Sequence, residues 1–450
     1  MSKDISLKKG LNINLKGEAD KVYATVSSSE KYVIKPTDFH SLIPKLVVKI
    51  GDKVNAGSVL FFDKYNERIK FTSPVSGEVS EINRGEKRRI LEVVIIPDGE
   101  IKYEAFPKGK ANDFSKDEII ENLLNSGVWP FIRQKPFDII ANPSDSPKSI
   151  FISSFNTAPM AADNDFVLHG MEKEFQFGLD IVSKLTDGNV HLNIDGNTNP
   201  SKVFTEAKGV VINRISGLHP SGNVGVQIHH IDPINKGDVI WYLYPQDVIA
   251  ISRLFSEGKY DASRIVALTG SQVLKPRYYR LISGSSIKNM LKDNILDHSN
   301  RYISGDVLTG TQIQKNSAIG FYDTQISVIP EGNYQEFFGW LLPGFNKFSI
   351  SRTFYSWLSP KRDYILDTNF HGEERAYVMT GQYEKVLPMN IYLQQLIKAC
   401  MIKDIELMEN LGIYEISEED VALCEFVCTS KIDVQNIIRD GLDLIKKECC

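Results

Sequence analysis

The sequence has no long hydrophobic run. No apolar stretch of its 450 residues approaches the roughly 18 residues that span a bilayer. Runs such as Val93–Ile96 have the length of single strands. The segment Met1–Gly10 carries charges and lacks the apolar core of a signal peptide. We therefore expect a soluble cytoplasmic protein that reaches a membrane only by docking on membrane partners.

Basic residues are not in excess. The chain has 52 Lys and Arg residues against 57 Asp and Glu residues, a formal net charge of −5. Proteins that hold nucleic acid through phosphate contacts need a basic excess. The composition therefore argues against a nucleic-acid partner.

Cysteine is scarce and confined to the end of the chain. The five cysteines are Cys400, Cys424, Cys428, Cys449 and Cys450. An odd number in a chain without a signal peptide favours free thiols over a disulfide framework. Ferredoxin-type proteins hold an iron–sulfur cube with four cysteines in the pattern C-x-x-C-x-x-C-x-x-x-C-P. Only Cys424 and Cys428 fit that pattern, so we interpret them as the remnant of a lost cluster motif and expect no metal.

Nucleotide and metal motifs are also missing. The chain has no G-x-G-x-x-G, Walker A or G-x-S-x-G sequence. His229 and His230 are adjacent, so in a strand they would face opposite sides and make poor metal co-ligands. Asp163-Asn164-Asp165 lacks the remaining EF-hand positions and is typical of a solvated turn.

Short strands broken by Gly and Pro indicate a β region over residues 1–104. Its segments "GDKVNAGSVL" and "SPVSGEV" resemble the barrel-sandwich hybrid of biotinyl and lipoyl carrier domains. Lys64 stands where those carriers bear their modified lysine. The hairpin here is longer and more charged, which favours an unmodified β module over a carrier.

Residues 105–258 alternate strands with helices, which predicts a Rossmann-like α/β domain with a largely parallel sheet. A capping box at Ser115 and Glu118 opens a helix that should end near Gly127. We predict further helices over 172–185 and 248–255, and strands over 148–153, 190–194 and 209–213.

The remaining chain divides into three parts. Residues 259–330, with "LTGSQVLKPRYYRLISGSSIKNMLKDN", resemble the soluble-ligand-binding β-grasp (SLBB) module. Residues 331–385 form a connecting, aromatic segment. Residues 386–450 show helical spacing and are interpreted as a degenerate ferredoxin-type domain. The fold class is thus a multidomain α/β protein, α+β overall.

This order of units resembles the flavin- and NADH-binding subunit of complex I and the C subunit of the Rnf complex. Those proteins carry a loop similar to "GxGGAGFP" after the first helix of the α/β domain. Here the equivalent residues 126–137 read "SGVWPFIRQKPF". Without the glycine-rich stretch of that loop the backbone cannot approach a pyrophosphate, so we expect flavin and NADH to be excluded.

The substituted loop and several other segments identify the chain as a member of one family, formed by the A subunits of the Na⁺-translocating NADH:quinone oxidoreductase (NQR). These segments are "DKYNERIKFTSPVSG", "SGVWPFIRQKPF", "GLHPSGNVGVQIHHIDP", "ISGDVLTGT", "FFGWLLPGFNKFSISRTF" and "EEDVALCEFVCTSK". The resemblance implies a peripheral protein on the cytoplasmic side of the bacterial inner membrane, bound to integral membrane subunits. The complex passes electrons from NADH through flavins and iron–sulfur centres to ubiquinone and exports Na⁺. This chain would bind no cofactor and catalyse nothing alone.

The resemblance also links the chain to quinone binding. A quinone ring needs an aromatic stack and a donor to a carbonyl oxygen. Trp129, Phe131, Arg133 and Phe137 replace the lost flavin loop and are the first candidates, unless they simply fill the vacated space as core. His219, in the Gly-rich "GLHPSGNVG", is a second candidate donor or part of a structural turn.

Several alternatives stay open. The segment Phe337–Phe354, with Trp340, could dock a membrane subunit or belong to the core. The chain could be a pure assembly scaffold without ligand, an electron-input subunit of the Rnf C type, or a carrier modified at Lys64.

Overall fold

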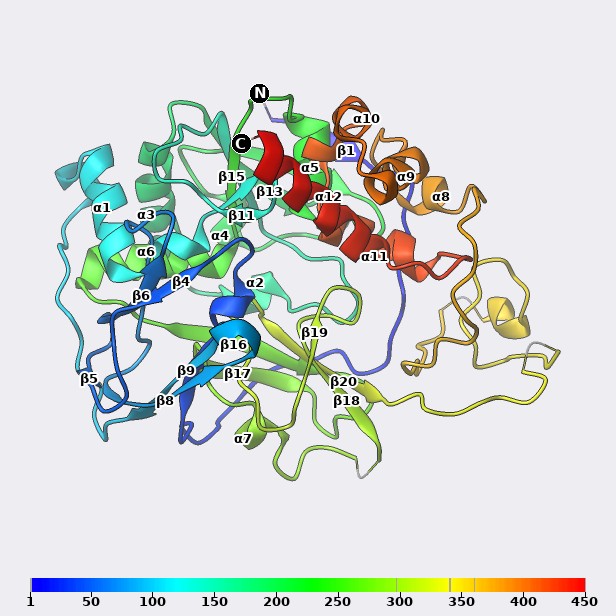
Figure 1. Ribbon diagram of the computed structural model, residues 1–450, viewed down its shortest axis with the longest axis horizontal. Coiled ribbons are helices and arrows are strands. Elements are labelled where there is room, and N and C mark those ends of the chain that lie inside the picture. The colour runs from blue at the N-terminus through cyan, green and yellow to red at the C-terminus, as the bar shows by residue number, and fades with distance from the viewer. Residues whose placement is uncertain (1, 297, 340, 360, 450) are drawn as a thin grey trace.

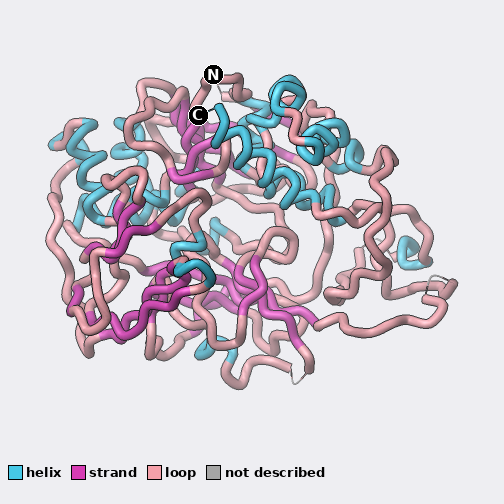
Figure 2. The backbone as a smooth tube through the Cα atoms, in the orientation of Figure 1, coloured by secondary structure: helices cyan, strands magenta, loops and turns pink. Residues whose placement is uncertain are grey.

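The computed structural model describes residues 2–449 except 297, 340 and 360. An α/β layer, two small β units and a C-terminal group of helices pack around a common centre (Figure 1). A long loop segment extends from one side, and Figure 2 shows that residues 331–382 are almost free of regular structure.

The α/β unit contains a seven-stranded sheet in the order β1-β14-β13-β12-β15-β10-β11. The first five strands run parallel, and the β10–β11 hairpin adds an antiparallel edge. The bounds are β1 Asp4–Ser6, β14 Val211–Ser216, β13 Asn189–Asp195, β12 Ser149–Ser153, β15 Ile240–Leu243, β10 Arg133–Lys135 and β11 Ile139–Ile140. The largely parallel sheet is confirmed.

Helices cover both faces of this sheet, because side chains alternate along its buried strands. In β12, Ile150 and Ile152 join a core with α1, α3 and α6, whereas Phe151 joins a second core with α5 and the C-terminal helices. The helices of the unit are α1 Lys116–Ser126, α2 Asn164–Val167, α3 Glu172–Val182, α4 Lys202–Thr205, α5 Val224–Ile231 and α6 Pro245–Glu257.

The predicted helix signals of the α/β unit are confirmed. The Ser115 side chain accepts from the Glu118 backbone N–H, and the Glu118 carboxylate accepts from Ser115. Gly127 ends α1 in a left-handed conformation, φ 77°, where a glycine is favoured. The predicted helices over 172–185 and 248–255 correspond to α3 with a following single turn, and to α6.

The N-terminal β unit consists of two small sheets. One has the order β3-β9-β8-β5, and the other the order β4-β6-β7. The bounds are β3 Tyr32–Ile34, β9 Ile90–Pro97, β8 Gly77–Arg84, β5 Lys53–Val54, β4 Pro44–Leu46, β6 Val59–Asp63 and β7 Lys70–Thr72. Lys64 follows β6 in an exposed turn.

The first residues of the chain leave this β unit. Strand β1 pairs in parallel with β14 of the α/β sheet, and β2 (Asp20–Ala24) pairs with β17 of the third sheet. Residues 4–24, which the sequence groups with the N-terminal β region, therefore tie two other units together.

The third unit contains a mixed six-stranded sheet in the order β19-β18-β20-β16-β17-β2. Its remaining bounds are β16 Ser263–Thr269, β17 Arg277–Ile282, β18 Asn300–Ser304, β19 Thr311–Ile313 and β20 Gln325–Pro330, with the short helix α7 Lys288–Leu291. The hairpin and short helix predicted after residue 264 are confirmed.

In the described part of the chain, five α-helices follow residue 382 and pack on the α/β unit, at the upper right in Figure 1. They are α8 Tyr383–Val386, α9 Leu393–Ile402, α10 Ile405–Asn410, α11 Glu418–Phe426 and α12 Val434–Cys449. Among the described residues, no helix combines the length and apolar character needed to cross a membrane.

The strand interpretation of His229 and His230 is wrong, because both lie at the end of helix α5. The β-branched residues before them favour a strand locally, but burial between the sheet and the C-terminal helices decides the conformation. His229 contacts Glu415 at 2.7 Å, and His230 contacts the Pro388 carbonyl at 2.7 Å. The histidines thus join α5 to the C-terminal helices.

Candidate functional site

The β10–β11 hairpin lies where the α/β unit meets the other three units. Arg133 and Lys135 point to one face of β10, and Gln134 points to the other. The two faces differ in what surrounds them. The first is packed with charged and aromatic side chains, and the second borders a cavity.

Three tyrosine rings surround the guanidinium of Arg133. Its central carbon lies 4.6 Å from the ring centre of Tyr242, 5.3 Å from that of Tyr244 and 4.6 Å from that of Tyr322. Asp138 lies 4.0 Å from a guanidinium nitrogen and accepts from the Tyr242 hydroxyl. The cation–π contacts and this ion pair hold Arg133 in place.

Lys135 continues this face into the C-terminal helices. Its ammonium group lies 3.0 Å from the Asp420 carboxylate and donates to the Ser417 hydroxyl at 2.6 Å. The two charged side chains are 2% and 0% exposed. Burial alone would lower the pKa of Lys135, but the adjacent Asp420 outweighs it and the pKa is raised. The pair joins the sheet edge to α11.

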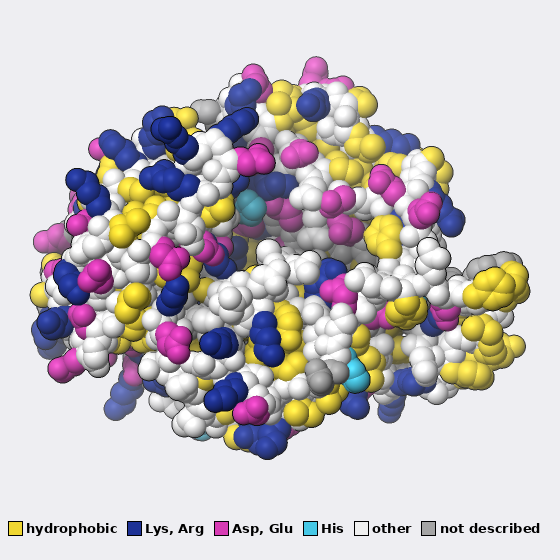
Figure 3. All heavy atoms as spheres, turned by 60° about the horizontal axis from the view of Figure 1, so that its bottom comes forward, with side chains coloured by type: hydrophobic (Ala, Val, Ile, Leu, Met, Phe, Trp, Pro, Cys, Tyr) yellow, Lys and Arg dark blue, Asp and Glu magenta, His cyan; other side chains and the backbone are white. Residues whose placement is uncertain are grey.

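Burial raises the pKa of three other carboxyl groups near Arg133, those of Glu419, Asp38 and Asp323. Burial, reinforced by the neighbouring Asp420, raises the pKa of Glu419 to about 8. Burial also raises the pKa of Asp38 to about 6, and it raises the pKa of Asp323. Arg133 and Asp138 remain 16% and 11% exposed, so the cluster is not fully closed to solvent. One face of the molecule is hollowed, with acidic and basic side chains in its depth (Figure 3).

On the opposite face of β10 lies a cavity of about 710 Å³. This volume is within the range of ligand-binding pockets, roughly 300–1,000 Å³. The lining comes from the N-terminal β unit, the β10–β11 hairpin, the loop before β15 and helix α12. It comprises His40, Ser41, Leu42, Asp63, Tyr65, Asn66, Ile69, Gln134, Pro136, Phe137, Ile139, Ile140, Asn142, Asp145, Lys236, Gly237, Asp238, Val239, Tyr414, Lys446 and Cys449.

The cavity lining combines apolar and aromatic residues with ten polar or charged ones. Phe137 and Tyr414 meet edge to face with ring centres 6.1 Å apart. Burial raises the pKa of Asp145, and the Asn142 backbone N–H donates to Gln134 at 2.8 Å. Such a lining suits a ligand with a flat ring and polar substituents.

The turn between β10 and β11 has a strained backbone. Phe137 and Asp138 both adopt positive φ angles, 80° and 52°. Non-glycine residues avoid this region, and such outliers concentrate at functional sites. Arg439 of α12 donates to the Phe137 carbonyl at 2.8 Å and so anchors the turn. The Phe137 ring is thereby fixed in the cavity wall.

The other predicted quinone residues lie elsewhere. Trp129 is fully buried, donates to the Ala141 carbonyl at 2.7 Å and packs on Trp241. Phe131 is also buried and stacks on Phe321 with ring centres 4.8 Å apart. Both side chains therefore belong to the core behind the hairpin. Of the predicted set, only Phe137 lines the cavity.

His219 is separate from both faces of β10. It is 3% exposed, and its Nδ1 lies 3.1 Å from the Thr157 hydroxyl. Burial lowers the pKa of His219 to about 4, so the ring is neutral at physiological pH. The structure therefore places it within the loop after β14 and away from the cavity lining.

Sequence reasoning missed most of the cavity lining. Gln134, Tyr65 and Tyr414 come from three separate units and share no local motif. The one available signal was the "RQKPFD" segment, where a hairpin turn carries an aromatic residue.

The thiols expected as a cluster remnant lie in the C-terminal core. Cys424 and Cys428 are 1% and 7% exposed, and the Tyr383 hydroxyl donates to the Cys428 sulfur at 3.0 Å. Burial raises the pKa of Cys424, so its reactive thiolate is disfavoured. Within the described part of the chain, no group of three or more His, Cys, Asp or Glu side chains is placed to hold a metal ion.

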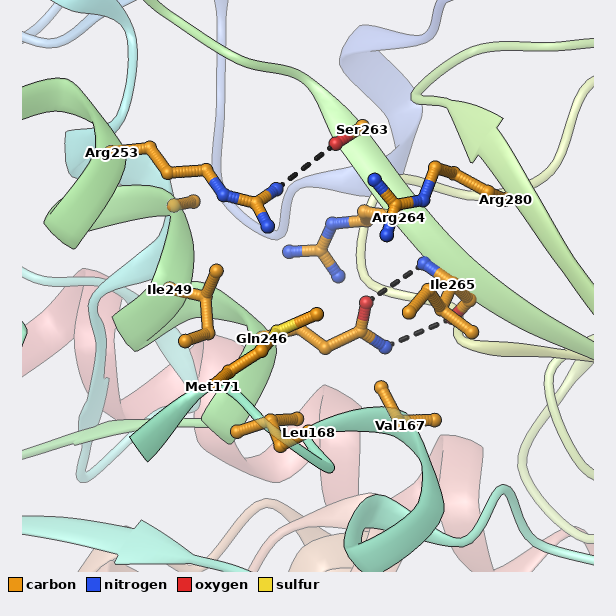
Figure 4. Close-up of a pocket in the computed structure, with 11 residues that line it drawn as sticks. Val167, Leu168, Met171, Gln246, Ile249, Arg253, Ser263, Arg264, Ile265 and Arg280 are labelled. Atoms are coloured by element: carbon orange, nitrogen blue, oxygen red, sulfur yellow. Dashed lines mark hydrogen bonds between the residues drawn. The ribbon is translucent and has the colours of Figure 1, made fainter. Parts of the chain in front are cut away.

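A second, much smaller cavity lies between α6 and strand β16. Its volume of about 20 Å³ suffices for one water molecule and not for a ligand. Figure 4 shows Arg253 donating to Ser263 and the Gln246 amide bonding twice to the backbone of Ile265. These contacts join the α/β unit to the third sheet.

The architecture defines a class of protein: a multidomain α/β chain built on a barrel-sandwich hybrid, with a ligand-sized cavity between its units. Three family models match in the same order. The NqrA N-terminal barrel-sandwich hybrid domain matches residues 5–98, the NqrA second alpha/beta domain residues 114–260, and the NQRA C-terminal domain residues 265–315.

Relatives match over nearly the whole length. The A subunit of the Na(+)-translocating NADH-quinone reductase from Haemophilus influenzae (strain PittGG) is 37% identical over 99% of this chain and 100% of its own. The proteins of the same name from Yersinia pestis bv. Antiqua (strain Angola) and Hahella chejuensis (strain KCTC 2396) are 36% identical over the same shares. The chain belongs to this NqrA family, the A subunits of the Na⁺-translocating NADH-quinone reductase.

Among solved structures, a chain of the NAD⁺-reducing [NiFe]-hydrogenase in the air-oxidized state matches at a TM-score of 0.35 and 11% identity. The match covers 51% of this chain and 52% of that chain. A likeness this distant carries no conclusion about the site.

Proposed function

We propose that this chain is the cytoplasm-facing subunit of a Na⁺-translocating NADH:ubiquinone oxidoreductase and contributes to quinone binding. The chain would hold no redox cofactor, so NADH, flavins and iron–sulfur centres would be bound by other subunits. Its partners would include the integral membrane subunits. Its contribution to electron transfer and Na⁺ export would be to bind quinone, and the chain alone would not catalyse the reaction.

The cavity beside Phe137 is the observation that carries this proposal. A ubiquinone headgroup is a flat ring with two carbonyl acceptors and an apolar tail. The walls offer the rings of Phe137 and Tyr414 for stacking, and His40 and Asn142 bring N–H groups to the same space. The cavity's volume accommodates the headgroup and the first part of the tail.

The remaining residues of the predicted quinone set would act indirectly. Trp129 and Phe131 pack behind the hairpin, and Arg133 fixes the opposite face. They would hold the Phe137 turn in position without touching the quinone. His219 would belong to a structural turn.

The ancestry of the units is part of the same proposal. The α/β unit would be a Rossmann-like domain whose phosphate loop was replaced, and the third sheet a β-grasp module. The C-terminal helices would descend from a ferredoxin-type domain, with Cys424 and Cys428 as the last of its ligands.

The test is a calorimetric titration of the purified chain with a short-chain ubiquinone. Ile139 lines the cavity, so Ile139→Trp should fill it and weaken binding by about tenfold or more. Ile212→Trp is a matched control at another partly buried position of the same sheet and should bind as the parent does.

Each alternative predicts a different result. A pure scaffold would bind no quinone in any variant. An Rnf C-type protein would absorb in the flavin or iron–sulfur region of the visible spectrum. A carrier would show added mass on Lys64 in an intact-mass measurement.

A further inference from the structure

The connecting segment carries a stretch of unusual composition. Residues 337–362, here called the aromatic lobe, read "FFGWLLPGFNKFSISRTFYSWLSPKR". They contain four basic residues and no Asp or Glu. The rest of the chain has 48 basic and 57 acidic residues, so the lobe is a local cationic region on an acidic protein.

Many apolar side chains of the lobe are exposed. Phe337 is 85% exposed, Leu341 64% and Leu358 62%. Further exposed members are Phe338, Leu342, Phe345, Tyr355 and Trp357. The segment projects from the side of the molecule in Figure 1, and hydrophobic side chains gather at that end in Figure 3. Exposing so many large apolar side chains is unfavourable in water, which marks an interaction surface.

The cations of the lobe lie beside its rings. The Arg352 guanidinium is 5.5 Å from the Trp357 ring centre, and the Lys347 ammonium is 5.2 Å from the Phe354 ring centre. Arg362 donates to the Phe345 carbonyl at 2.8 Å and thereby links the two ends of the lobe. Lys347 also pairs with the carboxylate of Glu336, the residue before the lobe. Rings and cations of the lobe are therefore close neighbours.

This combination matches the interface of a membrane. Aromatic rings favour the headgroup level, where one edge is apolar and the other wet. Lys and Arg side chains near the surface are attracted to anionic headgroups. A protein partner with an acidic surface would also attract the cations. However, it would not require so many large apolar side chains to be exposed on the same segment as the cations.

We propose that the aromatic lobe binds the surface of a bilayer through anionic lipid headgroups, with its apolar side chains inserted at the interface. The lobe would then orient the whole chain on the membrane independently of the quinone cavity. The inference does not depend on quinone binding, since the two sites share no residue.

The experiment is co-sedimentation of the full chain with vesicles. One set contains equal amounts of phosphatidylglycerol and phosphatidylcholine, and the other phosphatidylcholine alone. The parent should sediment with the anionic vesicles, should bind the neutral ones at least tenfold less, and should be released by added salt.

Two variants separate the contribution of the apolar side chains to vesicle binding from that of the cations. The triple variant Phe337→Ser, Leu341→Ser, Leu358→Ser and the pair Arg352→Glu, Lys361→Glu should each weaken binding at least tenfold. A matched control changes two exposed apolar residues outside the lobe, Tyr392→Ser and Ile402→Ser, and should bind like the parent. All these side chains are at the surface, so unchanged circular dichroism should confirm folding.

Three outcomes would overturn the proposal. The parent could fail to sediment with anionic vesicles, the lobe variants could bind as well as the parent, or neutral vesicles could bind equally. Binding only to membranes that contain the integral subunits, and not to lipid vesicles, would assign the lobe to a protein partner instead.

Discussion

The two faces of the segment Arg133–Phe137 differ in the side chains that pack against them. On one face, Arg133 and Lys135 are enclosed by tyrosines and carboxylates. On the other face, Gln134 and Phe137 border a cavity of about 710 Å³. A single strand therefore separates a filled, charged junction from an open space with a mixed apolar and polar lining.

The difference shows how one hairpin can support assembly and binding together. The charged face joins the α/β unit to α11 through a buried ion pair, which fixes where the C-terminal helices lie. Those helices in turn supply Tyr414 and Lys446 to the cavity on the other face. The charged junction is thus expected to govern stability, and the cavity to govern ligand affinity.

Removing one partner of the buried Lys135–Asp420 pair should lower the unfolding free energy more than any other change proposed below. Lys135→Met leaves the Asp420 charge buried without its cation, which should lower the unfolding free energy by about 3–5 kcal/mol. Urea unfolding followed by circular dichroism measures the change. The double variant Lys135→Met, Asp420→Leu should recover most of the loss. A loss below about 1 kcal/mol for the single variant would show that the pair does not govern stability.

A side chain forced against the Lys135–Asp420 pair should lower the unfolding free energy by a smaller amount. A Cβ atom on Gly225 of α5 would lie 2.2 Å from an Asp420 carboxylate oxygen. Gly225→Ala should therefore push the carboxylate from its place and destabilise the protein by about 1–3 kcal/mol. Gly99→Ala, where a Cβ meets nothing within 4 Å, is the matched control for the same unfolding measurement. Equal stability of the two variants would contradict the packing described for α5 and α11.

The charged face also predicts a pH dependence. The pKa of Glu419 is raised from 4.5 to about 8, so between these values the folded state binds more protons than the unfolded state. Stability contributed by this group is full below pH 4.5 and is lost as the pH rises through about 8. Glu419→Gln should flatten this decline in urea midpoints measured from pH 5 to 8. An unchanged slope would show that Glu419 is already ionised in the folded protein.

The cavity face predicts the smallest effect on stability. Ile139→Trp extends into open space, so the unfolding free energy should change by less than about 1 kcal/mol. Thermal unfolding provides the measurement, with the quinone titration run on the same sample. A large destabilisation would show that the space is closed in solution.

The sequence predicts the local parts of the fold well. The capping box at Ser115, helix α6 and the buried strand β12 all follow from spacing within about ten residues. Contacts between residues far apart in the sequence leave no such local pattern. Strand β1 joins β14 through the pair Ile5 and Ile215, and Lys135 meets Asp420 across 285 positions.

The residues that line the cavity could be predicted only in part from the sequence. Part of the segment 126–137, which the sequence singles out, does lie at the cavity, and Phe137 lines it. Trp129 and Phe131 are aromatic residues of the same segment but lie in a 3-10 turn before β10, and their side chains are buried in the core. Which rings reach the cavity depends on contacts with α12 and the N-terminal β unit.

Photo-crosslinking with a photoreactive ubiquinone, followed by peptide mapping, tests the central claim most directly. We predict labelling within residues 134–142 and on the opposing walls at Tyr65 or Tyr414, all of it displaced by excess ubiquinone and reduced in Ile139→Trp. Labelling confined to the loop around His219 or to the aromatic lobe, with none at the β10–β11 hairpin, would contradict the account.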